Sequence, residues 1–534
     1  MKNITKILLI LLNIVITSAV FAQQWTLLKD INPTGDSYVE FIPEWTGSAT
    51  HKLLIADDGV HGFELWITDG TVDGTKMLKD INPKGDAFVG TEMAMLGNNL
   101  YFFADDGVHG AELWKTDGTA VGTVLVKDIF PTTVQYQPDQ TNILTIGNAI
   151  YFLANDGVNG REIWKSDGTA LGTMMLANLN TTGDFANNND LYHLEVFNDD
   201  ILVHGTIAAQ TGLWKISTSG DAQFLFAFQY SGSQNNFTFN GKFYFRSFNN
   251  GYKLYATDGT AAGSGLVHSG NCVSDAVVYN GDCYFIGDNN DNQTTTNLWK
   301  ISKSDNSIVL VKKISNKQTQ STDLIVLNNK MLFYANEDVN DYVWMKSDGT
   351  AGGTTQLHDF TTSTHNASDL YAYNYVFNNE LYLVAEYGTS DYALFKTNGT
   401  TVNFVQNFIV SDDLGDLWSF GVINNKLYVS AANAETGLEL YTPEQTATGI
   451  FSSQNTTLNV NMYPNPFTDG LHIDIKETRS FTYQIVDIKG VPVRSGSFVE
   501  DSINTIDTHK LHAGMYVVMI YENGSLKGSY KVIK

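Results

Sequence analysis

The chain has 534 residues, and its 32 Lys and Arg against 57 Asp and Glu give a net charge of −25 at pH 7. Binding to nucleic acid needs a basic face that neutralises phosphates, so this balance argues against nucleic acid as a partner. The length would suit several ordinary domains or one long repeat array.

Residues 1–22 have the features of a cleavable secretory signal peptide. Lys2 and Lys6 precede the apolar run Ile7–Ile16, and Val20–Ala22 supplies tolerated residues at the cleavage site. The run is shorter than the roughly 20 residues that a membrane-spanning helix needs. We therefore expect export, and a mature chain without a transmembrane helix.

The next 420 or so residues, about 23–441, repeat one pattern. An aromatic residue marks each copy at intervals of 41 to 51 residues. These residues are Trp66, Trp114, Trp164, Trp214, Tyr255, Trp299, Trp344, Phe395 and Tyr441. The copies at 64–75, 112–123 and 162–173 resemble the ELWxxDGT repeat family of secreted bacterial proteins. The resemblance implies a repeat fold and no settled activity.

Each period contains four short apolar runs, here called a, b, c and d. In the second period they are Glu92–Leu96, Leu100–Ala104, Ala111–Lys115 and Thr123–Ile129. Runs a and b are joined by residues that accept the positive φ of a tight turn, which predicts antiparallel hairpins. The predicted turns are Asn98-Asn99, Asn148-Ala149, Asp199-Asp200, Asn240-Gly241, Asn280-Gly281, Asn328-Asn329, Asn378-Asn379 and Asn424-Asn425.

The b runs indicate how the sheets pack. They are apolar at successive positions, so both faces of each strand must be covered. Four-stranded sheets stacked around an axis do this in a β-propeller. The predicted fold class is therefore all-β, with a propeller of about nine four-stranded repeats. The pattern is kelch-like, although kelch's paired glycines are missing. A sandwich would show more alternation, and a β-solenoid would need a shorter coil.

The Asp-Gly-Thr element between runs c and d predicts a structural turn. The Asp side chain can accept backbone amides in an Asx turn, Gly supplies a strained φ, and Thr adds a hydroxyl contact. The element is similar to the Asp box of sialidases. Its copies contain Asp69, Asp117, Asp167, Asp258 and Asp348.

The ninth period lacks a d strand. Residues 25–33 match d runs such as 77–83, so we expect the N-terminal segment to complete the last sheet and close the ring, which would remove free sheet edges. Nine repeats exceed the usual four to eight. Either the ring is unusually wide, or one degenerate period, the fourth or the sixth, lies outside it.

The cysteines are Cys272 and Cys283, and export would permit a disulfide. If Asn280-Gly281 is a two-residue turn, Cys283 faces Val278. Cys272 precedes Val278 by six positions, roughly 20 Å along an extended strand. A bond needs Cα atoms within about 7 Å. It would form only if Cys272 belongs to a loop that folds back.

Residues 442–459 are polar and rich in Thr and Ser, as in a linker. Strand-like runs follow at 471–475, 483–487 and 515–521. Residues 460–534 resemble the type A C-terminal sorting domain of the type IX secretion system, a small Ig-like β-sandwich. The matching motif positions are Tyr463, Pro464, Asn465, Pro466, Gly490, Gly514 and Tyr516.

That resemblance implies a route and a partner. Cargo of certain Gram-negative bacteria carries this domain, and secretion machinery at the outer membrane recognises it. We therefore expect passage through the periplasm to the cell surface or the exterior. An unrelated Ig-like module is the alternative.

A ligand is expected on the face formed by the b–c and d–a loops, since variable loops on a rigid scaffold carry binding. The candidate residues are Asp57, Asp58, His61, Asp105, Asp106, His109 and Asp156. Their oxygens could hold Ca²⁺. The spacing does not match an EF-hand, however, and turn-forming Asp-Gly explains these residues equally well, so we expect no cofactor.

The leading functional hypothesis is a non-catalytic propeller that binds an extracellular ligand, either a glycan or a protein. The alternative is a carbohydrate-active enzyme, a glycoside hydrolase or lyase, that uses acids on the loop face. A sialidase site would need three arginines, whereas the repeat region contains only Arg161 and Arg246. No nucleophile elbow, phosphate loop or dinucleotide fingerprint occurs.

Overall fold

The structure is a computed structural model in two compact units, one up to Pro443 and one from Glu444. The residues it describes are 25–88, 92–131, 143–181, 194–228, 236–248, 252–272, 274–289, 295–316, 323–338, 341–359, 370–387, 391–409, 419–433, 436–443, 460–463, 467, 470–475, 481–487, 492–498, 503–509, 511, 514–522 and 525–534. All regular structure in these ranges is β. No helix there is long and apolar enough to cross a membrane.

Within the described residues, the first unit contains nine four-stranded antiparallel sheets, numbered here in chain order. Sheets 1 to 3 comprise β2 (Glu40–Phe41), β3 (Lys52–Asp57), β4 (Phe63–Thr68) and β5 (Lys76–Lys79); β6 (Ala94–Leu96), β7 (Asn99–Asp105), β8 (Ala111–Thr116) and β9 (Val124–Lys127); and β10 (Leu144–Ile146), β11 (Ala149–Asn155), β12 (Arg161–Ser166) and β13 (Met174–Met175).

Sheets 4 to 6 comprise β14 (Glu195–Phe197), β15 (Asp200–Ile207), β16 (Gln210–Ile216) and β17 (Ala222–Phe226); β18 (Phe237–Phe239), β19 (Lys242–Phe248), β20 (Tyr252–Thr257) and β21 (Gly265–His268); and β22 (Val277–Tyr279), β23 (Asp282–Gly287), β24 (Thr296–Ile301) and β25 (Ile308–Ser315).

Sheets 7 and 8 comprise β26 (Ile325–Leu327), β27 (Lys330–Asp338), β28 (Asp341–Ser347) and β29 (Thr355–Asp359); and β30 (Leu370–Phe377), β31 (Glu380–Tyr387), β32 (Asp391–Thr397) and β33 (Val402–Ile409). Sheet 9 comprises β34 (Phe420–Ile423), β35 (Lys426–Asn433), β36 (Gly437–Pro443) and the N-terminal strand β1 (Trp25–Lys29).

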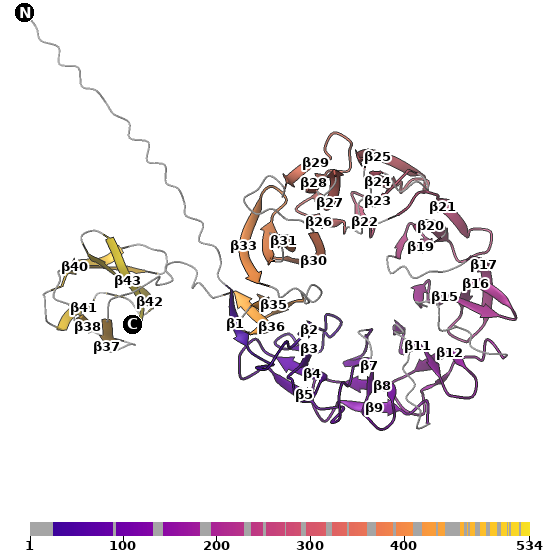
Figure 1. Ribbon diagram of the computed structural model, residues 1–534, viewed down its shortest axis with the longest axis horizontal. Coiled ribbons are helices and arrows are strands. Elements are labelled where there is room, and N and C mark those ends of the chain that lie inside the picture. The colour runs from indigo at the N-terminus through magenta and orange to yellow at the C-terminus, as the bar shows by residue number, and fades with distance from the viewer. Residues whose placement is uncertain are drawn as a thin grey trace, which may run out of the picture. The chain divides into compact units, whose positions relative to one another are not determined.

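The nine sheets follow one another around a ring, with the a strands towards its middle and the d strands at its rim (Figure 1). An apolar cluster lies between each pair of consecutive sheets, and one of these clusters joins sheet 9 to sheet 1. The fourth and sixth periods each pack on both neighbours. Neither degenerate period therefore lies outside the series of contacts.

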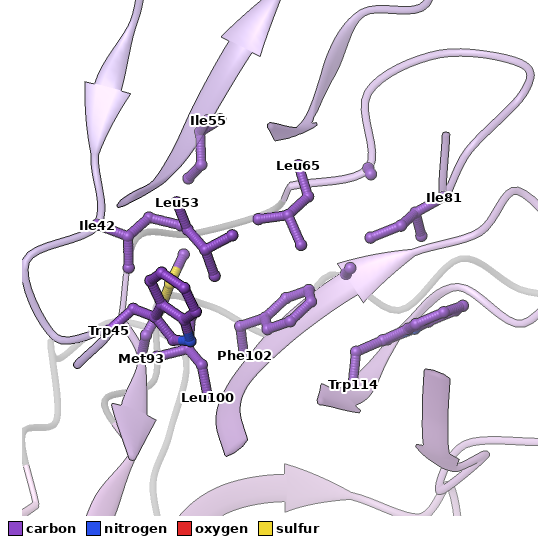
Figure 2. Packing of buried hydrophobic residues seen from close by; sticks show 12 residues of the cluster. Ile42, Trp45, Leu53, Ile55, Leu65, Ile81, Met93, Leu100, Phe102 and Trp114 are labelled. Atoms are coloured by element: carbon purple, nitrogen blue, oxygen red, sulfur yellow. The ribbon is translucent and has the colours of Figure 1, made fainter. Parts of the chain in front are cut away.

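The interface between sheets 1 and 2 shows why the b strands are apolar on both sides. Leu53 and Leu65 of sheet 1 pack against Leu100 and Phe102 of sheet 2 (Figure 2). The intervening residue of β7, Tyr101, faces sheet 3 instead. Successive residues of a strand point to opposite faces, so a run without alternation fills two interfaces at once.

The a–b hairpins form as expected, but three turns lie one residue earlier than predicted. Leu96 pairs with Asn99, and Phe197 pairs with Asp200, so the turns are Gly97-Asn98 and Asn198-Asp199. The third sheet repeats the first shift, because Ile146 pairs with Ala149. Glycine at 97 and 147 takes the positive φ that the prediction assigned to the following Asn.

The N-terminal strand completes sheet 9, which confirms the sequence prediction. Strand β1 pairs antiparallel with β36, and its register joins Trp25 to Pro443 and Leu27 to Tyr441. Strand β36 therefore continues through Thr442 and Pro443, beyond the predicted start of the linker at 442. The rest of that linker, 444–459, lies outside the described residues.

One repeat aromatic was assigned one residue too early. In sheet 2, Trp114 pairs with Phe102 and faces sheet 1, whereas in sheet 7 Met345 holds the equivalent position and faces sheet 6. Trp344 lies on the opposite side of β28, towards sheet 8. The interface accepts either a thioether or an indole, because both fill the same apolar space.

The described part of the second unit forms two antiparallel sheets. Their strands are β37 (Val460–Tyr463), β38 (Gly470–Ile475) and β41 (Ile503–Asp507), and β40 (Pro492–Ser497), β39 (Thr482–Asp487), β42 (Met515–Glu522) and β43 (Ser525–Ile533). Residues of both sheets, such as Ile473 and Val518, share one buried core. The three strand runs predicted from the sequence are β38, β39 and β42.

Candidate functional site

The b–c loops of sheets 1 to 3 contain the predicted ligand-binding residues. In the first loop, Asp57 accepts a hydrogen bond from the Gly59 amide at 2.7 Å. Oδ1 of Asp58 accepts the amides of Val60 and His61, and Oδ2 lies 2.8 Å from Nδ1 of His61. Asp58 therefore uses both oxygens inside its own loop, and Asp57 uses one.

The second and third loops repeat this geometry. Asp105 accepts the Gly107 amide, and Asp106 accepts two amides and lies 2.7 Å from Nδ1 of His109. In the third loop the Asn159 amide group donates to Asp156 at 2.7 Å, in the place of the histidine. The three loops share one conformation, but they do not bring the candidate residues of different loops together.

Hydrogen bonding inside the loops shifts the pKa values in opposite directions. Partial burial raises the pKa of Asp58, but the bonds donated by His61 and Val60 outweigh it and lower the pKa below its ordinary value. The bond to Asp58 raises the pKa of His61. Asp106 and His109 behave in the same way. Each pair favours an ionised Asp beside a protonated His.

No group of three or more His, Cys, Asp or Glu side chains among the described residues is placed to hold a metal ion. The oxygens proposed for Ca²⁺ in the sequence are those that accept the loop amides.

The Asp-Gly-Thr turns have the predicted local geometry. Asp117 accepts the amide and the hydroxyl of Thr119, and the Thr119 hydroxyl accepts the Gly122 amide. The same bonds recur at Asp69, Asp167, Asp258 and Asp348. Asn398 replaces Asp in sheet 8 and keeps the turn.

These turns also fasten neighbouring sheets, which sequence reasoning missed. Lys79, on the d strand of sheet 1, donates to the Thr123 carbonyl at the end of the sheet 2 turn at 2.7 Å, and its Nζ lies 5.8 Å from the Trp114 ring centroid. Lys127 makes the equivalent bond to Thr173. The Lys that recurs in the d runs was the sequence signal that could have predicted these bonds between sheets.

Gly118 is needed for both conformation and space. Its φ is +87°, and a Cβ there would lie 2.6 Å from a ring carbon of Trp45 in sheet 1. We expect Gly118→Ala to lower the free energy of unfolding by about 2–4 kcal/mol, combining left-handed strain with overpacking. Chemical denaturation would measure this.

Gly97→Ala is the matched control, because Gly97 has φ +62° and a Cβ there would meet no atom within 4 Å. It should cost only the strain, about 1–2 kcal/mol. Equal losses in the two variants would contradict a role for the contact with Trp45.

The glutamate of the repeat motif is buried and binds the backbone of the segment that follows the d strand, which the sequence pattern did not reveal. Glu112 is 2% exposed, and its two oxygens accept the amides of Ile129 and Phe130 at 2.8 Å. Glu64 holds Ile81 and Asn82 in the same way. In sheet 9, Glu439 accepts the amides of Ile31 and Asn32, so these hydrogen bonds join the N-terminal segment to the last sheet.

Burial raises the pKa of Glu64, Glu112 and Glu439 to about 7, although the two amide donors to each carboxylate oppose this. The ordinary value is 4.5, so between pH 4.5 and 7 the folded state binds protons more tightly than the unfolded state. The stability that these groups contribute is fully present below about pH 4.5 and is lost as the pH rises through about 7.

The free energy of unfolding of the first unit should therefore fall between about pH 5 and pH 8, by an amount on the order of 1 kcal/mol per carboxyl group, and its melting temperature should fall with it. Differential scanning calorimetry would measure it. The triple variant Glu64→Gln, Glu112→Gln and Glu439→Gln should show a flatter pH dependence, even if it melts lower throughout. An unchanged slope would contradict this assignment.

The two cysteines are free thiols in the same core cluster, between sheets 5 and 6. Cys272 lies in the loop after β21 and pairs in an isolated bridge with Gly287, at the end of the strand that carries Cys283. The loop does fold back onto β23, as a disulfide would require, but no bond is present.

The sorting-motif residues lie in the second unit. Tyr463 ends β37, Gly514 precedes β42, and Tyr516 is buried beside Phe467, with ring centroids 6.4 Å apart. Pro464, Asn465, Pro466 and Gly490 lie outside the described residues.

Residues 461–534 match the family described as "Secretion system C-terminal sorting domain". A type IX sorting domain is thus found at this end of the chain. Such a domain implies the type IX machinery as a partner, and a location at the cell surface or outside the cell. The match does not extend to the repeats, whose resemblance to the ELWxxDGT family remains a prediction.

Among curated proteins, none matches the sequence. Solved structures that are similar include puromycin hydrolase, at 11% identity and TM-score 0.32 over 70% of this chain and 61% of that one. A mutant of puromycin hydrolase complexed with PGG matches at 10% identity and TM-score 0.32, over 63% of this chain and 57% of that one. A structure from a study of two prolyl endopeptidases matches at 8% identity and TM-score 0.31, over 72% of this chain and 55% of that one. The chain spans less than two thirds of the length of each.

Proposed function

We propose that the protein is an exported nine-bladed β-propeller that binds an extracellular ligand without catalysis. The observation that carries this proposal is a type IX sorting domain on the same chain as a ring of four-stranded sheets. The nine interface clusters, which return from sheet 9 to sheet 1, support one closed propeller. Residues 1–22 would direct the first export step as a signal peptide.

The b–c loop face of sheets 1 to 3 is the proposed binding face. Its loops are held in one conformation by side chain to backbone hydrogen bonds, so little conformational entropy would be lost on binding. Asp58, Asp106 and Asp156 each use both oxygens inside their own loop. This favours a scaffolding role over general acid–base catalysis for these three acids.

The test is to apply the purified mature protein to a glycan array and to a peptide array, and to assay release of reducing sugar from the same glycans. Retention without turnover would support the proposal. Turnover that one Asp or Glu substitution abolishes would overturn it in favour of a carbohydrate-active enzyme. Absence of retention on both arrays would also contradict it.

A further inference from the structure

Three consecutive sheets expose an aliphatic side chain at the same position. Val60, Val108 and Val158 each occupy the tip of a b–c loop, and they are 80%, 70% and 85% exposed. Single exposed apolar residues are ordinary on protein surfaces. Here the same residue recurs at the same place in sheets 1, 2 and 3. We call the three loops, residues 57–62, 105–110 and 155–160, the valine strip.

The fold does not need these valines. Each side chain points away from the core clusters, and the loop conformation is set by the preceding Asp and by glycines with positive φ, such as Gly59 and Gly62. Sheet 4 joins its b and c strands with the two-residue turn Ala208-Ala209 and no such loop. A polar residue at the tip would serve folding as well, because the methyl groups meet water.

The loops that carry the first two valines also pack closely against the segments that follow the preceding d strands. A Cβ on Gly59 would lie 2.5 Å from Oδ1 of Asn32, and one on Gly107 would lie 2.6 Å from Oδ1 of Asn82. Asn32 and Asn82 belong to the segments that lead from the preceding d strands, and the buried glutamates hold both segments. The strip is therefore a rigid surface, and ordering it would cost a partner little.

The charge of the strip indicates the chemistry of its partner. Asp57, Asp58, Asp105, Asp106 and Asp156 give it five acidic residues, and the three loops contain no Lys or Arg. His61 and His109 pair with Asp58 and Asp106, and Lys84 donates to the Gly107 carbonyl at 3.1 Å, so the acidic groups of the strip still outnumber the cationic ones. A partner that covers the valine methyl groups must bring apolar side chains, and the surrounding carboxylates favour Lys or Arg among them. Methyl groups offer no hydrogen bond to a sugar hydroxyl, which favours a polypeptide over a glycan.

We propose that the valine strip binds an extended, basic polypeptide segment that carries aliphatic side chains. Sheets that pack face to face lie about 10 Å apart, so three loops span roughly 20 Å, which about six or seven extended residues would cover. This inference rests on the proposed binding function and names the partner class for that face.

The test measures binding of the full mature chain to synthetic peptides of about ten residues. One set alternates Lys with Leu or Val, a second replaces the aliphatic residues by Ser, and a third replaces Lys by Glu. Only the first set should bind, and raising the salt concentration should weaken it. The triple variant Val60→Ser, Val108→Ser and Val158→Ser should lose at least about tenfold in affinity.

The matched control is Val121→Ser with Leu171→Ser. These residues are 90% and 93% exposed on the c–d turns, at the opposite ends of the c strands from the strip. The control should bind like the parent protein. Equal loss in both variants, or equal binding by all three peptide sets, would overturn the inference. Retention on a glycan array without peptide binding would overturn the inference alone, whereas retention on neither array would overturn the proposed function as well.

Discussion

A variant that lacks residues 25–29 is expected to unfold or aggregate under conditions in which the parent protein is folded. The deletion removes β1, leaves β36 as an open sheet edge and uncovers the cluster between sheets 8 and 9, in which Trp25 is 3% exposed. Replacing a buried Trp by Ala costs about 3–5 kcal/mol, and loss of the strand adds to that. The total approaches the stability of a typical domain, about 5–15 kcal/mol.

Point variants that keep β1 test whether its buried side chains and hydrogen bonds stabilise the ring. Trp25→Ala should lower the melting temperature strongly, and Glu439→Ala should cost about 1–3 kcal/mol because the Ile31 and Asn32 amides lose their acceptors. Leu27→Ala is the control in the same strand, because Leu27 is 36% exposed. A deletion variant that melts within about 2 °C of the parent, a shift that corresponds to no more than about 1 kcal/mol, would show that the ring does not depend on β1.

The second large effect concerns export. A chain that ends at Pro443 should reach the periplasm but not cross the outer membrane, because the sorting domain at 461–534 is absent. Its first unit should keep the melting transition of the full chain, since the described contacts of β1 with β36 all lie before residue 444. Cell fractionation and immunoblotting of an intact, secretion-competent host would measure the distribution.

The control for this experiment is the full-length chain in the same host, which should appear at the cell surface or in the medium. A second variant, Tyr516→Ala, opens the core of the sorting domain without shortening the chain. It should reduce export to the extent that it unfolds that domain. Truncated protein in cell-free medium would contradict the assignment of outer-membrane passage to residues 461–534.

The sequence predicted that Asp58 and His61 belong to a b–c loop, but not the hydrogen bonds that they form there. The sequence pointed to Asp58 and His61, and the structure places both in one loop, bonded to each other. Whether either contacts a ligand remains a prediction. The exposure of Val60 could not be anticipated, because an apolar residue in a sequence pattern is ordinarily assigned to the core.

By itself, the sequence determined the features that depend on a few neighbouring residues. The Asp-Gly-Thr turns, the Asn and Gly hairpins and the doubly buried b strands follow from local φ preferences and from the period of a strand. The match between the N-terminal segment and the other d runs likewise predicted which strand completes sheet 9.

Only the tertiary structure decided which distant groups meet. The Glu112 carboxylate accepts amides 17 and 18 residues away. Glu439 accepts the equivalent amides, which lie 408 and 407 residues away because the N-terminal strand completes sheet 9. In strand β1, Trp25 is 3% exposed, whereas Leu27, two residues later, is 36% exposed. Such contacts depend on how sheets stack in space, and the spacing of residues along the chain carries no record of that stacking.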